Sequence, residues 1–130
     1  MKKLVALDPA FAEESAFDSS LTRRVWEMRN LTPEALSPGQ LSLCLRQLIA
    51  VNHVAPIAAR LLKSEPMLEA ELYPGDLLNA LLHADNNGRL SADQRADLLV
   101  ICRSALAQAE GADQTLVGAI RRYLNSYHDA

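Results

Sequence analysis

Leucine and alanine dominate this chain, and that bias constrains the fold more than any other feature of the sequence. The two residues fill 43 of 130 positions, whereas valine, isoleucine and threonine together fill only 13. Leucine and alanine favour helices, whereas β-branched residues favour strands. No segment alternates polar and apolar residues for the length of a strand. We therefore predict an all-α fold, a bundle of about six to eight mostly short helices in a single domain over residues 1–130.

Two serines are expected to begin helices, because each stands three residues before a glutamine. Ser37 with Gln40 and Ser91 with Gln94 match the capping box, in which the two residues exchange side chain–backbone hydrogen bonds. The apolar residues that these helices would bury are Leu41, Cys44, Leu45, Leu48 and Ile49 in the first, and Leu98, Ile101, Cys102, Ala105 and Leu106 in the second.

Three prolines mark other helix boundaries. Pro56 is tolerated best in a first helical turn, so we expect a break between helices near residues 52–53. Pro66 should end the next helix and begin a short one that runs through Leu72. The Tyr-Pro-Gly-Asp run at 73–76 should open a further helix, whose buried residues are Leu77, Leu78, Leu81 and Leu82.

The charge of the chain excludes some classes of partner. It carries 13 Lys and Arg residues against 16 Asp and Glu residues, a formal net charge of -3. Nucleic-acid-binding proteins usually present a basic surface, so direct nucleic-acid binding is not expected. The apolar runs are too short for a signal peptide or a membrane span. We expect a cytoplasmic protein that does not contact a membrane.

Residues that carry enzyme chemistry do not cluster in this sequence. His53, His83 and His128 have no catalytic spacing, and the chain offers too few converging ligands for a metal. Cys44 and Cys102 lie among leucines and isoleucines, which predicts two reduced, buried thiols. The sequence therefore predicts a protein that is not an enzyme and holds neither metal nor cofactor.

The net negative charge is concentrated in residues 61–90, which contain five carboxylates but only two basic residues, Lys63 and Arg89. Carboxylates in first helical turns would explain part of this excess through the helix dipole. The alternative is an acidic surface that meets a basic partner. In the helix after Pro74, three of the polar residues align opposite the buried leucines. The predicted contact residues are Glu65, Glu69, Glu71, Asp76, Asn79, His83 and Asp85.

A longer pattern then resembles a family of immunity proteins from bacterial contact-dependent growth inhibition (CDI) systems. The resemblance covers residues 17–82, and the run at 73–78, Tyr-Pro-Gly-Asp-Leu-Leu, is its most specific part. The other matching positions are Arg23-Arg24, Met28-Arg29-Asn30-Leu31, Leu45-Arg46, Leu48-Ile49, Val54, Pro56-Ile57-Ala58, Leu61-Leu62 and Glu65-Pro66.

The resemblance implies a small cytoplasmic protein that neutralises the C-terminal toxin domain of a large exoprotein. Such toxin domains are often nucleases, whose clefts must be basic to attract RNA, so an acidic inhibitor surface would suit them. An alternative is a helical regulator or adaptor that binds nucleic acid through Arg23, Arg24 and Arg29, or binds another protein. A small enzyme with an unrecognised site is the third hypothesis.

Overall fold

A computed structural model of the chain describes residues 2–8, 20–108 and 114–128, and it confirms the all-α prediction. Within these residues there are seven α-helices and no strand. The helices are α1 (Leu4–Leu7), α2 (Ser20–Glu27), α3 (Pro38–Arg46), α4 (Val51–Ser64), α5 (Asp76–Asn86), α6 (Ala92–Ala107) and α7 (Gln114–His128), with a single 3-10 turn, η2 (Pro33–Ala35).

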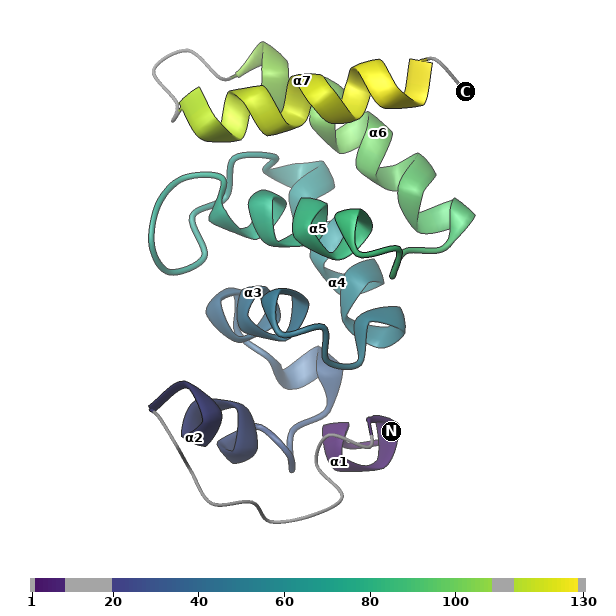
Figure 1. The fold of residues 1–130 in the computed structure, drawn as a ribbon. Helices are drawn as coiled ribbons and strands as arrows, with labels where there is room; N and C mark the ends of the chain where they lie inside the picture. Colours follow the sequence, from purple (N-terminus) through teal and green to yellow (C-terminus); the bar gives the residue numbers. More distant parts are fainter. Residues whose placement is uncertain (1, 9–19, 109–113, 129–130) are drawn as a thin grey trace.

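The helices stack in two rows (Figure 1). One row contains α3, α5 and α7, and the second row, behind it, contains α4 and α6. Within each row a helix packs against the next but one in sequence, so α3 contacts α5, α5 contacts α7 and α4 contacts α6. Stacked helix pairs of this kind bury one continuous core between the rows and leave side chains of the first row accessible.

Both predicted capping boxes are confirmed. At the start of α3, the Gln40 backbone N–H donates to Ser37 Oγ at 3.2 Å, and the Ser37 backbone N–H donates to Gln40 Oε1 at 2.9 Å. Ser91 and Gln94 make the same two contacts at the start of α6. These reciprocal bonds satisfy N–H groups that a helix start leaves unpaired, which explains why the sequence placed the two boundaries correctly.

Most of the predicted leucine-rich core is confirmed, although Leu48 and Leu106 are only partly buried. Leu77, Leu78, Leu81 and Leu82 of α5 are all buried. Cys44 and Cys102 are fully buried and free, and burial raises the pKa of each thiol to about 12. Both thiols therefore behave as small apolar core groups at neutral pH.

The predicted break near residues 52–53 is wrong, because α4 already begins at Val51 and holds Pro56 in its second turn. The chain turns earlier, at Leu48 and Ala50, which both adopt left-handed backbone conformations, with φ of 57° and 47°. The Ala50 N–H donates to Asp8 Oδ2 at 2.7 Å, a contact with the N-terminal segment that stabilises this turn. Pro56 is exposed, so water can replace the helical hydrogen bond that it cannot donate.

The short helix predicted after Pro66 is also wrong. The residues between α4 and α5 form an irregular loop, in which Glu69 and Pro74 make an isolated antiparallel bridge. We call residues 65–75 the acidic loop, because Glu65, Glu69 and Glu71 are all exposed on it. Its conformation depends on a side chain that lies beyond it, in the first turn of α5.

Candidate functional site

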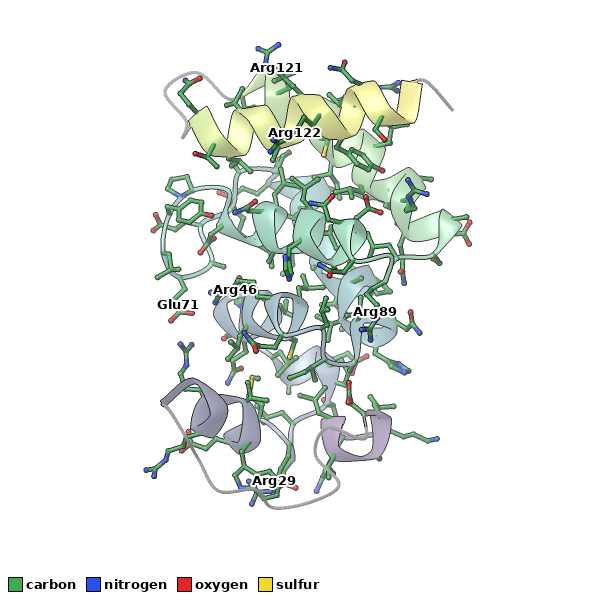
Figure 2. All side chains as sticks on the ribbon, viewed as in Figure 1. Arg29, Arg46, Glu71, Arg89, Arg121 and Arg122 are labelled. Atoms are coloured by element: carbon green, nitrogen blue, oxygen red, sulfur yellow. The ribbon has the colours of Figure 1, made fainter. Side chains whose placement is uncertain are left out.

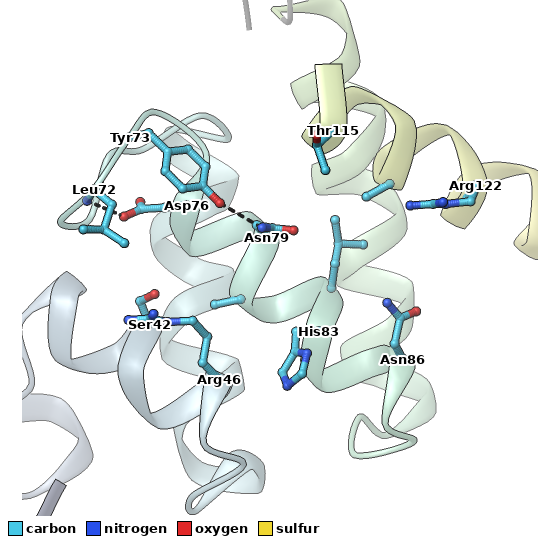
Figure 3. Close-up of a pocket in the computed structure, with 13 residues that line it drawn as sticks. Ser42, Arg46, Leu72, Tyr73, Asp76, Asn79, His83, Asn86, Thr115 and Arg122 are labelled. Carbon is cyan, nitrogen blue, oxygen red and sulfur yellow. Dashed lines mark hydrogen bonds between the residues drawn. The ribbon is translucent and has the colours of Figure 1, made fainter. Parts of the chain in front are cut away.

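The carboxylate of Asp76 fixes the conformation of the acidic loop. Its Oδ1 accepts a hydrogen bond from the Ala70 N–H at 2.6 Å, and its Oδ2 accepts from the N–H groups of Glu71 at 2.9 Å and Leu72 at 2.8 Å. Figure 3 shows the bond from Leu72. Asp76 is only 5% exposed, so the loop is wrapped around a buried anion.

The same hydrogen bonds decide the ionisation of this carboxyl. Burial by itself raises the pKa of Asp76, but backbone N–H groups of the loop outweigh that effect and hold the pKa below its ordinary value. Asp76 is therefore charged at neutral pH. Asp76 is one of the predicted contact residues, but its side chain is buried and engaged by the loop, so we assign it the structural role of holding the loop.

Gly75 closes the loop in a conformation that suits glycine. Its φ is 89°, in the left-handed region, and its N–H donates to the Met67 carbonyl at 3.0 Å. A Cβ atom at this position would collide with Leu116 of α7 and press on Met67. The Pro-Gly-Asp part of the most specific sequence motif thus encodes a loop geometry that packs directly against the last helix.

The exposed face of the acidic loop combines charge with an apolar side chain. Glu65 and Glu69 are exposed, and Glu71 faces Arg24 of α2, with 3.1 Å between Glu71 Oε1 and the Arg24 guanidinium (Figure 2). Leu72, next to Glu71, is 63% exposed, more than any other large apolar residue described. A rigid loop with an exposed leucine among carboxylates has the composition of a protein contact surface.

Asp85 lies apart from this surface. Its Oδ1 is 3.1 Å from Nε of Arg95 in α6, and its side chain is only 11% exposed. Burial raises the pKa of Asp85, although the neighbouring Arg95 partly opposes that effect. The structure therefore separates the predicted residues into a loop group (Glu65, Glu69 and Glu71), a buried anchor (Asp76) and a carboxylate directed at α6.

The remaining predicted residues line a cavity of about 400 Å³ between α3, α5 and α7, which we call the groove. Asn79 and His83 lie along α5 as predicted, and the Asn79 side-chain amide donates to the Tyr73 hydroxyl at 2.8 Å (Figure 3). The acidic loop adjoins one end of the groove, since Leu72 and Tyr73 also line it. Loop and groove are thus neighbouring parts of one surface.

Two groove residues, Arg46 and Arg122, are not among the predicted contact residues. Arg46, at the end of α3, and Arg122, on α7, lie far apart in the chain, and each stands in the sequence as one more arginine of a helix. Only the stacking of α3 and α7 on either side of α5 brings them to one cavity. No spacing rule in the sequence connects them.

The arginines of the alternative hypothesis are engaged within the protein. Arg24 pairs with Glu71, and Arg29 stacks on the Trp26 ring, with its Cζ 4.2 Å from the ring centroid. Arg29 also donates to the Trp26 carbonyl at 3.1 Å. Two of the three arginines therefore already have partners within the protein, and the Glu71 carboxylate offsets the charge of Arg24, so the geometry does not favour the nucleic-acid hypothesis.

The groove does not bring together the groups of a familiar reaction. Among the described residues that line it, the one carboxylate is that of Asp76, which accepts hydrogen bonds from backbone N–H groups. Among the residues that the structure describes, no group of three or more His, Cys, Asp or Glu side chains could hold a metal ion.

None of the described helices is both long enough and apolar enough to span a bilayer.

A helical protein with a rigid acidic loop beside a polar groove has the features of a protein-binding module. Comparison with known families agrees: the family model of CDI immunity proteins matches residues 7–96. The chain therefore belongs to the family of CDI immunity proteins, as the resemblance in its sequence indicated. No curated protein and no solved structure matches it. The family implies a cognate CDI toxin as partner.

Proposed function

We propose that this protein acts in the cytoplasm as a single-domain inhibitor that binds the C-terminal toxin domain of a CDI exoprotein and blocks it without catalysis. We further propose that the toxin is a nuclease with a basic surface. Membership of the immunity family supports the first statement. The acidic loop supports the second, because a surface that attracts RNA also attracts carboxylates.

The observation that carries this proposal is the exposure of Glu65, Glu69 and Leu72 on a loop whose backbone is already fixed. Asp76 and Gly75 hold that backbone before any partner arrives. A preorganised loop loses little conformational entropy on binding, so more of its contact energy contributes to affinity. Asn79 and His83 would extend the contact into the groove.

The first test is a charge reversal on the loop, measured by titration calorimetry and stopped-flow association with the toxin domain encoded directly upstream of this gene. The double variant Glu65→Lys, Glu69→Lys should associate about 10 to 100 times more slowly at low salt, because electrostatic steering becomes repulsion. The difference should shrink as salt screens the charges.

A matched control reverses two other exposed carboxylates, Glu27→Lys and Glu34→Lys, which lie on α2 and η2. The net charge changes equally, so the control separates a local contact from a global charge effect. Leu72→Ala should weaken binding by about 1–2 kcal/mol if its exposed surface becomes buried in the complex. Equal rates for the loop and control variants would exclude the acidic loop from the interface.

A further inference from the structure

Two guanidinium groups and one imidazole line the groove from three different helices. Arg46 comes from α3, His83 from α5 and Arg122 from α7. In Figure 3 the Arg46 guanidinium extends along α3 toward Ser42, and Arg122 extends from α7 toward α5. In an acidic protein, this groove is therefore a locally basic site.

These groups have no partners within the part of the chain that the structure describes. Arg46 and Arg122 form no ion pair there, and the His83 imidazole makes no hydrogen bond. Asp76, the one carboxylate among the described residues that line the groove, points its oxygens at loop N–H groups and not at the guanidiniums. The described lining therefore offers the two guanidiniums no counter-charge.

The size and surroundings of the cavity define the anion that would fit. A volume of about 400 Å³ lies near the lower end of the ~300–1,000 Å³ range of small-ligand pockets. It admits one or two side chains but not a length of polynucleotide. The carboxylates of the adjoining loop would also repel a polyanion much more strongly than a single carboxylate, whose repulsion the surrounding basic residues of a basic partner would offset.

We propose that the groove binds acidic side chains of the partner protein, with Arg46 and Arg122 each available to hold one Asp or Glu and with Asn79 and His83 of α5 lying between them (Figure 3). This inference rests on the proposed function, because it takes the toxin domain as that partner. A guanidinium can bind a carboxylate through two parallel hydrogen bonds, which fixes the orientation of the incoming side chain.

The consequence is an interface with two charge signs side by side. The acidic loop would face basic residues of the toxin, and the groove would accept an acidic one next to them. A toxin that is merely basic would satisfy the loop but leave the groove cations buried without counter-charges, which is costly. The groove would therefore select one toxin among many basic ones.

The α7 side of the groove supports a role in selecting one toxin. The family match ends at residue 96, so Arg122 lies outside the matched segment. The groove thus combines two walls from the family fold with a third from residues beyond the family match.

The affinity test compares Arg122→Ala with Arg121→Ala in the full chain. Both arginines are exposed on α7, but Arg121 points away from the bundle and does not line the groove (Figure 2). Arg122→Ala should weaken binding to the upstream-encoded toxin domain by about tenfold or more, because a toxin carboxylate would lose its partner in a desolvated site. Arg46→Ala should weaken binding by a similar factor for the same reason. Arg121→Ala should leave the affinity unchanged.

A second measurement identifies the anion directly. In Arg122→Lys the new amine would lie close to the bound carboxylate, so a zero-length carbodiimide reagent should couple it to an Asp or Glu of the toxin. Mass spectrometry of the cross-linked peptide would name that residue. Arg121→Lys, treated identically, should yield no such product.

Four outcomes decide the matter. Weaker binding with a cross-link to a toxin carboxylate supports the inference. Groove variants that bind as tightly as the wild type overturn it, while leaving the proposed function intact if the loop variants still lose affinity. A wild-type chain that does not bind the toxin overturns both. Retardation of transfer RNA that is lost in Arg46→Ala and Arg122→Ala would show that the groove binds phosphate, and would overturn the carboxylate assignment.

Discussion

The carboxylate of Asp76 offers the most direct test of how the acidic loop is held. Replacing it by the nearly isosteric amide, in Asp76→Asn, keeps one acceptor oxygen and turns the other position into a donor. If the amide oxygen takes the place of Oδ2, it still accepts from Glu71 and Leu72, but the NH2 group then faces the Ala70 N–H. One hydrogen bond becomes a donor–donor contact, and the other two lose their ionic character.

The expected cost follows from these contacts. A hydrogen bond to a charged group contributes about 1.5–3 kcal/mol, and about half as much when both partners are neutral. Asp76→Asn loses one such bond and weakens two others. The variant also no longer pays the desolvation penalty of a buried charge, which offsets part of the loss. The net destabilisation is about 2–4 kcal/mol. The competing explanation is that Asp76 merely interacts with the dipole of α5, which is worth about 0.3–1 kcal/mol.

Urea unfolding followed by circular dichroism distinguishes the two explanations, with Asp93→Asn as the matched control. Asp93 is an exposed carboxylate in the first turn of α6, so it shares the dipole interaction but holds no loop. Asp76→Asn should cost about 2–4 kcal/mol, and Asp93→Asn less than about 1 kcal/mol. Similar small losses for both variants would refute the assignment of Asp76 as the anchor of the loop.

The pH dependence provides an independent check of the same contacts. The folded-state pKa of Asp76 lies below its ordinary value, so its contribution to stability is complete above that value, about 3.9, and is lost as the pH falls through the folded-state pKa. The stability difference between wild type and Asp76→Asn should therefore be constant from pH 7 down to about pH 5 and shrink in stronger acid. A difference that grows on acidification would contradict the assigned direction of the shift.

Two further predictions concern the core. Gly75→Ala and Gly88→Ala share the cost of placing a Cβ in a left-handed conformation, about 1–2 kcal/mol. Only Gly75→Ala also collides with Leu116, so it should lose about 1–3 kcal/mol more in urea unfolding; equal losses would show that the last helix moves freely away. Cys44 and Cys102 are buried with pKa values of about 12, so neither should react with a thiol reagent at pH 8 until urea unfolds the chain; rapid labelling of the native protein would contradict their burial.

Much of the fold could be predicted from the sequence, because its signals are local. The capping boxes at Ser37 and Ser91 depend on residues three positions apart, and the leucines of α5 reveal their buried side through helical spacing alone. The break near residues 52–53 and the short helix after Pro66 were predicted wrongly for the opposite reason. The α3–α4 turn depends on a hydrogen bond that the Ala50 N–H donates to the Asp8 carboxylate, and the loop depends on Asp76. Neither contact follows from a local rule.

The candidate site divides in the same way. Glu65, Glu69 and Glu71 could be named from the sequence, since a local excess of carboxylates is visible without a structure. Asp76 belongs to the same excess, and only its burial shows that it holds the loop instead of facing a partner. Arg46 and Arg122 could not be assigned to a common site from the sequence, because no local pattern links a position on α3 with one on α7.

The sequence by itself determined which residues form helices, which side of each helix is buried and where negative charge accumulates, because these properties arise between residues a few positions apart. The tertiary structure decided which carboxylates are accessible and which distant cations share a cavity. Those properties depend on how α3, α5 and α7 stack, and stacking brings together side chains whose separation along the chain carries no information about their distance in space.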